Sequence, residues 1–209
     1  MRVLVACEYS GIVREAFSRA GHFAVSCDLL PSEQAGNHYQ GNVLDILNDN
    51  WDLMIAHPPC DKLSFSGNDY LNIDKYGEKA VLRYAQREKA MDFFRTLWNA
   101  PINKICIENP IGYPIQLIKH TQVIHPYFFG DCNMKRTALW LKNLPPLYHT
   151  KQDTLFETKT HTDYPKPIYI GKKNIYRTSA IGGKNKDAAK ERAKFFPKVA
   201  EAMATQWSE

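Results

Sequence analysis

The first 110 residues alternate short apolar runs with polar turns and helical segments, and this alternation limits the chain to few architectures. Apolar runs rich in β-branched residues predict strands at residues 2–7, 22–27, 42–44, 52–56 and 104–107. Apolar residues at helical spacing predict helices at 12–20 and 77–99. Strands that alternate with helices are joined by right-handed crossovers, so we expect an α/β fold with a mostly parallel sheet and helices on both faces.

The predicted helix at 77–99 has one apolar stripe that we expect to be buried, formed by Val81, Leu82, Ala85, Met91, Phe94, Leu97 and Trp98. A further strand is predicted at 137–141. Composition then divides the chain into a main domain at 1–144, an insert at 145–184 rich in Pro, Tyr and Lys, and a helix at 185–209 packing on the main domain. Pro197 breaks or restarts that helix.

The positive charge of the chain is concentrated near its end. Residues 151–209 carry 12 Lys and Arg against 7 Asp and Glu, whereas residues 1–150 carry 15 of each kind. A basic segment on a neutral body is typical of a polyanion contact, and a solvated charged surface is the alternative.

Five cysteines without a Cys-x-x-Cys pair predict neither a disulfide framework nor a zinc site, and we expect no metal. No apolar run reaches the roughly 18 residues of a membrane span, and the first residues do not read as a signal peptide. We therefore expect a cytoplasmic protein.

Polar residues follow the first three predicted strands and fit a nucleoside cofactor. The loop Glu8-Tyr9-Ser10-Gly11 leads into a helix whose first amides could meet an anionic group. Asp28 is placed to accept hydrogen bonds from ribose hydroxyls, and Asp45 to contact an adenine amino group. A simple cap of the turn at Gly11 is the alternative.

Cys60 and Glu108 follow the fourth and fifth predicted strands. Cys60 lies in a polar turn, where cations and loop amides could stabilise a thiolate nucleophile. Because parallel strands end at one edge of a sheet, Glu108 could face the same pocket. A carboxyl group beside a desolvated heterocycle would have a raised pKa and could protonate a ring nitrogen. The alternative for Glu108 is a cap of the following turn.

These motifs resemble the DNA cytosine-C5 methyltransferase family, in particular its small phage-type members. The resemblance is carried by the Gly11 loop, Asp28, Asp45, the run from Pro59-Cys60 to Ser64, and Glu108-Asn109-Pro110. It implies a Rossmann-like fold that binds S-adenosylmethionine and a thiolate of Cys60 that attacks C6 of cytosine. Glu108 would contact N3 and the amino group, and C5 would take the methyl group.

The resemblance also suggests further site residues. Pro58 is a candidate cofactor contact, and Ser64 and Asn109 are candidate substrate contacts. The family's Gln-x-Arg-x-Arg strand has no clear match. The pair Lys135-Arg136 is our candidate for its cationic role, with Arg136 as the catalytic cation and Lys135 as a substrate contact, and a surface basic pair is the alternative. The family pattern also departs here at a single glycine in the first loop, at Asp61 and at Pro110.

The space of the family's target-recognition domain is reduced to about 40 residues, which predicts a few DNA contacts through Lys172, Lys173 and Arg177. The DNA could be duplex or single-stranded. Two alternatives stay open. His57-Pro-Pro-Cys60 also resembles the loop of amino methyltransferases, which act on N4 of cytosine or N6 of adenine without a covalent adduct. The chain could also be a catalytically inactive module that binds nucleic acid.

Overall fold

A computed structural model of the chain describes residues 1–131, 133, 135–149, 168–170, 173–175 and 194–208. Its centre is a seven-stranded sheet of order β3-β2-β1-β4-β5-β7-β6. The strands are β1 (Arg2–Ala6), β2 (Phe23–Asp28), β3 (His38–Gln40), β4 (Leu53–Ala56), β5 (Lys104–Pro110), β6 (Gln122–Ile124) and β7 (Thr137–Lys142). The pairs among β1 to β5 are parallel, and β7 runs antiparallel to both neighbours. The prediction of a Rossmann-like α/β fold with a mostly parallel sheet is confirmed.

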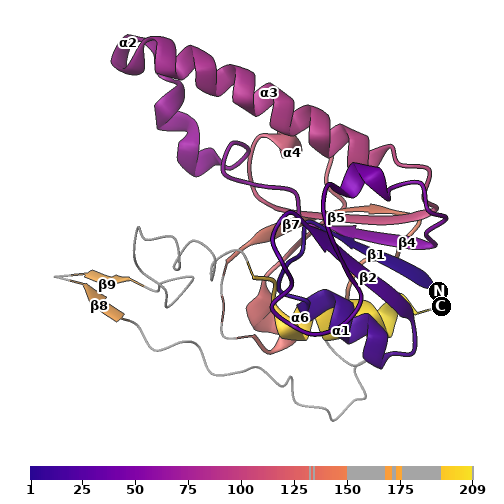
Figure 1. Ribbon diagram of the computed structural model, residues 1–209. Coiled ribbons are helices and arrows are strands. Elements are labelled where there is room, and N and C mark those ends of the chain that lie inside the picture. The colour runs from indigo at the N-terminus through magenta and orange to yellow at the C-terminus, as the bar shows by residue number, and fades with distance from the viewer. Residues whose placement is uncertain (132, 134, 150–167, 171–172, 176–193, 209) are drawn as a thin grey trace.

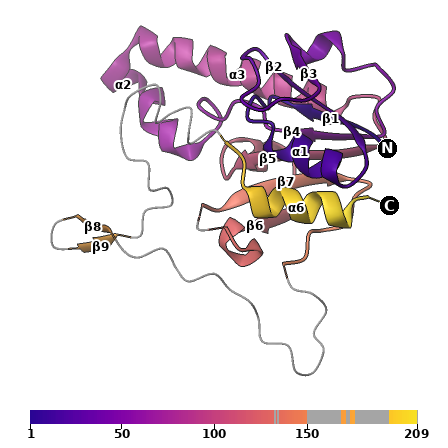
Figure 2. The ribbon, with the colours of Figure 1, turned by 60° about the horizontal axis from the view of Figure 1, so that its bottom comes forward.

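Helices cover both faces of this sheet, as Figures 1 and 2 show. Helices α1 (Ile12–Arg19) and α6 (Pro197–Gln206) lie side by side on one face, and α3 (Glu78–Trp98) and α4 (Pro114–Leu117) on the other. Alternation along β1 serves the two cores, because Val3 and Val5 pack with α1 and α6 whereas Leu4 packs with α3. The apolar runs of the central strands are therefore buried on both sides, as is typical of parallel sheets.

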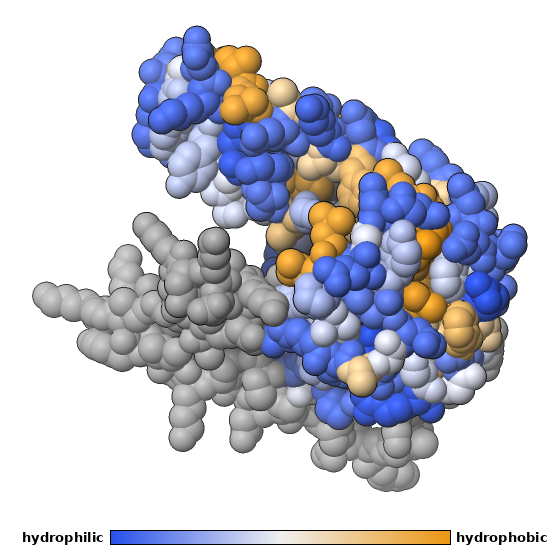
Figure 3. Space-filling model, in the orientation of Figure 1, coloured by the Kyte–Doolittle hydropathy of each residue, from blue (hydrophilic) through white to orange (hydrophobic). Residues whose placement is uncertain are grey.

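The outer half of α3 extends beyond the sheet together with a 3₁₀ segment at Phe65–Leu71 and α2 (Ile73–Tyr76) (Figure 1). The prediction that Val81, Leu82 and Ala85 are buried is wrong: Val81 and Leu82 are 55% and 61% exposed. Ala80 and Arg87 are buried nearer the start of α3, and Met91, Phe94 and Leu97 are buried where the helix reaches the sheet. Figure 3 shows apolar surface near the outer end of this arm. Periodicity identified the helix but not how much of it meets the sheet.

The third predicted strand is also misplaced. Residues 43–45 form a 3₁₀ turn, because the side chain of Asn42 accepts a hydrogen bond from the amide of Leu44 at 3.1 Å. The strand that pairs with β2 is β3, four residues earlier. Strand β6 was not predicted at all.

The last helix begins at Pro197, whose ring suits the first helical turn. Asp131 accepts hydrogen bonds from the amides of Lys198 and Val199 there, which fixes α6 to the body of the fold. Strands β8 (Ile168–Ile170) and β9 (Lys173–Ile175) form a separate antiparallel pair. The predicted limits of the insert stay predictions, because most of 145–184 lies outside the described residues. In the part of the chain that is described, no helix has the length and apolarity to cross a membrane.

Candidate active site

The loop after β4 holds Cys60 in a tight turn. Its backbone leaves the strand with the amide of His57 bonded to the carbonyl of Ala6 at 2.9 Å. The carbonyl of Cys60 then accepts the amides of Leu63 and Ser64 at 3.1 and 2.9 Å. Proline at 58 and 59 excludes further ladder hydrogen bonds, so the strand ends and the thiol lies beyond the sheet edge. Cys60 is half-buried.

This turn is tied to the segment after β5. The amide of Tyr113 donates to the carbonyl of Leu63 at 2.6 Å, and Ser64 forms a bridge with Gly112. A Cβ at Gly112 would lie 2.2 Å from the Leu63 carbonyl oxygen, so only glycine fits. From α3, Arg87 donates to the carbonyl of Lys62 at 3.1 Å. The loops after β4 and β5 are therefore held together, as their neighbouring strand ends predict.

Glu108 points into this junction from β5 and is 8% exposed. Its Oε1 accepts a short hydrogen bond from the hydroxyl of Thr137 on β7. Its Oε2 lies 3.3 Å from Nδ1 of His57. Asn109, next in the strand, donates from Nδ2 to the carbonyl of Pro58 at 2.9 Å and is 1% exposed. Asn109 thus holds the loop from inside, and its role as a substrate contact stays a prediction.

The pKa of the Glu108 carboxyl group depends on its burial and on its side-chain partners. Burial raises the pKa of its carboxyl group, but the contacts with His57, Lys135 and Thr137 lower that pKa by more, so it lies below the usual value. These partners favour the ionised form of the carboxyl group in the ligand-free protein. The raised pKa predicted beside a bound heterocycle stays a prediction.

The thiol of Cys60 differs from the expectation. Burial raises its pKa, and the charges of Glu108 and Asp61 add to the rise, while Lys135 lowers it. The neighbouring Lys62 does not help, because its Nζ pairs with Asp61 at 2.9 Å. The turn alone therefore leaves a thiol rather than the expected thiolate.

Lys135 is the cation that acts on both candidate catalytic groups, since it lowers the pKa values of Cys60 and Glu108. Arg136, the predicted catalytic cation, is exposed, whereas Lys135 beside it is half-buried. The catalytic role of Arg136 stays a prediction.

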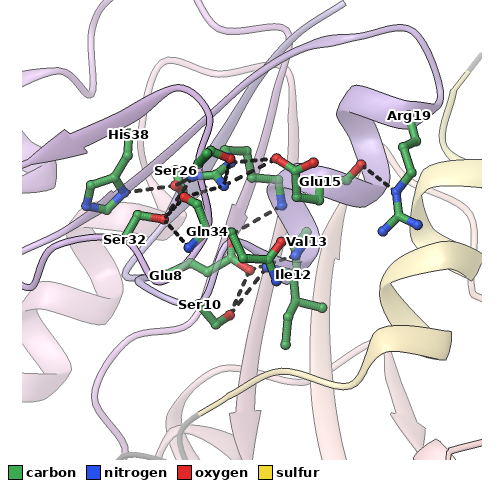
Figure 4. Close-up of polar contacts among 12 residues, drawn as sticks. Glu8, Ser10, Ile12, Val13, Glu15, Arg19, Ser26, Ser32, Gln34 and His38 are labelled. Carbon is green, nitrogen blue, oxygen red and sulfur yellow. Dashed lines mark hydrogen bonds and ion pairs between the residues drawn. The ribbon is translucent and has the colours of Figure 1, made fainter.

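The polar groups of the first loop form hydrogen bonds with one another and with the start of α1, as Figure 4 shows. Glu8, 4% exposed, accepts hydrogen bonds from the amides of Val13 and Arg14 at 2.6 and 3.2 Å and from the hydroxyl of Ser10 at 3.3 Å. These are the amides that were expected to meet a cofactor's anionic group. Tyr9 and Ser10 are also buried, at 7% and 2% exposure. This loop caps α1 from within.

Gly11 is required by the same packing. Its φ of 74° lies in the left-handed region, and a Cβ there would lie 2.6 Å from the guanidinium of Arg14. That fully buried guanidinium is bonded to the hydroxyls of Ser26 and Ser32 and to two backbone carbonyls of the loop after β2. The single glycine of this loop thus has a structural cause.

A pocket of about 270 Å³ opens beside this loop, on the α3 face. It is lined by Cys7, Cys27, Asp28, Leu29, Gly41, Asn42, Val43, Pro59 and Phe93. Asp28 lies where it was predicted, with Oδ1 accepting from the amide of Leu30 at 2.9 Å. Asp45 does not line the pocket and instead accepts from the hydroxyl of Tyr39, and Pro59 lines it in place of Pro58.

The other candidates divide between described and undescribed residues. Ser64 bonds through its hydroxyl to Ser66 at 2.9 Å and precedes the 3₁₀ segment without a side-chain capping hydrogen bond. Lys173 begins β9, while Lys172 and Arg177 lie outside the described residues. No group of three metal-ligating side chains occurs in the part of the chain that the structure describes.

Three residues beside the candidate site were not among the predicted site residues: His57, which was named only as part of the loop motif of amino methyltransferases, Thr137 and Asn42. Asn42 follows Gly41, a turn signal that marks the end of the preceding strand. Thr137 begins an antiparallel strand whose pairing with β5 no local pattern reveals. His57 precedes the Pro-Pro pair, directly after an apolar run, and its position at a strand end was the available signal.

Comparison with known proteins finds likeness only among solved structures. No protein-family model and no curated protein sequence matches the chain. A proposed DNA modification methyltransferase encoded within an E. coli prophage is 14% identical with a TM-score of 0.40, covering 68% of this chain and 46% of that one. The Dnmt2 methyltransferase of S. pombe is 14% identical with a TM-score of 0.37, covering 71% and 51%. This chain spans about half the length of either protein, and at these values the likeness assigns no residue and no activity.

Proposed function

We propose that the chain is an S-adenosylmethionine-dependent methyltransferase that acts on C5 of cytosine in DNA. The observation that carries this proposal is the joining of Cys60 and Glu108 at neighbouring strand ends, with Lys135 acting electrostatically on both. A nucleophilic thiol, a carboxyl group and a cation around one space are what addition to a pyrimidine ring requires.

The chain's own residues account for the addition step. Cys60 loses its proton to solvent and its sulfur bonds to C6, while N3 of the ring takes a proton delivered through the carboxyl group of Glu108. Lys135 lowers the pKa of the thiol and so increases the fraction of thiolate. The carbonyl of Pro58, held by Asn109 at 2.9 Å, lies in the same loop as a second acceptor for an exocyclic amino group.

The pocket beside the first loop suits the nucleoside part of the cofactor. Its volume is near the lower end of the roughly 300–1,000 Å³ typical of ligand sites. Leu29, Val43 and Phe93 offer apolar contacts to a base, and Asp28 offers a carboxylate oxygen to ribose. Bound S-adenosylmethionine supplies the methyl group that C5 receives. We propose that the first loop shapes this site through Glu8, Tyr9, Ser10 and Gly11 without giving up its own hydrogen bonds.

Transfer of a labelled methyl group tests the proposal. The protein is incubated with cytosine-containing DNA and labelled S-adenosylmethionine, and the modified nucleoside is identified after digestion. We expect 5-methylcytosine from the wild type and none from Cys60→Ala. A Cys60→Ala variant that methylates C5 as well as the wild type would contradict the mechanism, and label on N4 of cytosine or N6 of adenine would favour an amino methyltransferase.

We further propose that Lys172, Lys173 and Arg177 neutralise DNA phosphates. Replacing all three with Gln should weaken DNA binding and flatten its salt dependence, because fewer counterions are released. Cofactor binding should stay unchanged. An unaltered salt dependence would mean that the basic end of the chain is a solvated surface.

A further inference from the structure

The side chain of His57 is 11% exposed, and its polar contact among the described residues is with Glu108. Its Nδ1 lies 3.3 Å from Oε2 of Glu108, and both side chains are close to one-tenth exposed. Its Nε2 is buried and has no hydrogen-bond partner among the described residues. Its ring lies against the ring of Phe195, with centroids 4.5 Å apart. The polar contact with Glu108 is thus what fixes this imidazole.

Charged groups face His57 from several elements. Glu8 comes from the loop after β1 and is close enough that His57 lowers its pKa. Glu108 comes from β5, and Lys135 acts on Glu108 from the segment before β7. Phe195 closes the remaining side without charge. Glu8 is already bonded to the amides of α1, so Glu108 is the carboxyl group that can exchange a proton with the ring.

Burying a polar ring costs free energy unless its nitrogen atoms are hydrogen-bonded. An apolar side chain next to Phe195 would not carry this cost. Glu108 has Thr137 on its other oxygen, so the carboxyl group is held from two sides. A carboxylate that must protonate a substrate needs a source for that proton.

We propose that His57 is a positioning residue for Glu108 that also supplies the proton which Glu108 gives to the cytosine ring. This inference rests on the proposed function. It names a proton path of this chain, from Nδ1 of His57 through Oε2 of Glu108 to N3.

The proton balance of the step is closed. The Cys60 thiolate, formed beforehand by loss of a proton to solvent, bonds to C6, and the electron pair of the C5–C6 double bond moves into the ring. The imidazolium of His57 passes its Nδ1 proton to Oε2 of Glu108 and becomes neutral, and N3 takes that same proton from the carboxyl group, which is left ionised. After C5 has received the methyl group from S-adenosylmethionine and lost its proton to water, the Cys60 sulfur leaves C6 and the N3 proton returns along the same path.

The pH dependence of covalent trapping tests this path. The rate of adduct formation with DNA containing 5-fluorocytosine is measured with saturating S-adenosylmethionine, for the wild type, His57→Asn and the control His120→Asn. Iodoacetamide alkylation of Cys60 in the same proteins gives the thiolate fraction at each pH, and the trapping rate is divided by it. Asn keeps a donor near the position of Nδ1 but carries no exchangeable charge.

We expect the corrected rate to fall as pH rises, because the His57–Glu108 pair loses its proton. In His57→Asn the fall should move to lower pH by at least about one unit, since an ordinary carboxyl group titrates about two units below an ordinary imidazole. His120→Asn should match the wild type. A rate lowered equally at every pH in His57→Asn would overturn the proposal, because it would mean that His57 only packs.

A proton resonance separates this inference from the proposed function. The hydrogen-bonded Nδ1–H should give a downfield NMR signal in the wild type that is lost in His57→Asn and in Glu108→Gln. Its absence from the wild type would overturn the inference. If the signal is present but the wild type forms no covalent complex with cytosine DNA, the proposed function fails while the positioning of Glu108 by His57 stands.

Discussion

Two buried glutamates stand at the ends of two parallel strands, Glu8 after β1 and Glu108 in β5, and their surroundings differ. Glu8 accepts backbone amides of α1, which continue the regular structure of its own segment. Glu108 is held by side chains from two other strand ends, those of His57 and Thr137. Burial raises the pKa of Glu8, whereas the partners of Glu108 lower its pKa below the usual value.

The difference teaches how to separate a structural carboxyl group from a candidate catalytic one when both are buried. A cap made from backbone amides saturates the carboxylate and leaves nothing for a ligand. Side-chain partners that can donate and exchange protons leave a group able to change its charge during a reaction. We therefore assign Glu8 to stability and Glu108 to the proposed chemistry.

The largest effect is expected from Glu108→Gln. Loss of a group that protonates the ring should lower the methylation rate by about 10²–10⁴-fold. The amide still fits between His57 and Thr137, so the melting temperature should change little. Single-turnover methylation and thermal unfolding measure the two effects, and an active Glu108→Gln protein would remove the distinction between the two glutamates.

Glu8→Ala should show the opposite pattern. Two amides at the start of α1 and the hydroxyl of Ser10 lose their acceptor inside the protein, which should cost about 2–4 kcal/mol of the free energy of unfolding. Urea denaturation measures this, with Glu15→Ala on the same helix as the matched control. A loss below about 1 kcal/mol would mean that Glu8 is not the cap we describe.

The pocket beside the first loop gives a smaller effect. Asp28→Ala removes the carboxylate that lines the pocket and should weaken S-adenosylmethionine binding by about tenfold to a hundredfold, the range of one hydrogen bond to a charged group. Asp45→Ala, outside the pocket lining, should bind as the wild type does. Calorimetry compares them, and equal losses in both variants would restore the original assignment of Asp45.

The pH dependence of Cys60 alkylation distinguishes the effects of Lys135 and Arg136, the two neighbouring cations before β7. Cys60 has a raised pKa, so its alkylation by iodoacetamide should still be increasing as pH rises past the usual range of a thiol. Because Lys135 lowers that pKa, Lys135→Ala should move the curve to higher pH, and Arg136→Ala should leave it in place. The reverse result would return the catalytic cation to Arg136.

The smallest effect is expected at the outer half of α3, which supports the Cys60 loop without packing on the sheet. Leu82 is 61% exposed, so Leu82→Ala should change the free energy of unfolding by less than about 0.5 kcal/mol. Urea denaturation decides this. A loss above about 2 kcal/mol, usual for a buried leucine, would place Leu82 in a core.

The sequence predicts the parts of this protein that depend on local pattern. The apolar runs of β1, β2, β4 and β5 follow from periodicity, and the contact between the loops after β4 and β5 follows from the rule that parallel strands end at one edge. The partners of Cys60 and Glu108 do not follow. Thr137, 29 residues away in the chain, reaches Glu108 through an antiparallel pairing. The charge of Lys135, predicted only as a substrate contact, lowers the pKa values of both Cys60 and Glu108.

Local sequence pattern also does not show which polar groups are already engaged in hydrogen bonds within the fold. The sequence of the first loop is typical of a cofactor-binding loop. In the structure, however, the first amides of α1 donate to Glu8, and the guanidinium of Arg14 lies beside Gly11 where a Cβ would be. Asn42 rather than Asp45 reaches the pocket, because a capped turn replaces the predicted strand. Such substitutions depend on side-chain geometry in three dimensions.

The most direct test of the central claim is mass spectrometry of the protein after incubation with 5-fluorocytosine DNA and S-adenosylmethionine. The account predicts a stable protein–DNA adduct whose digestion places the nucleotide on the peptide that contains Cys60, in the wild type but not in Cys60→Ser. Methyl transfer without any adduct, or an adduct on another cysteine, would contradict it.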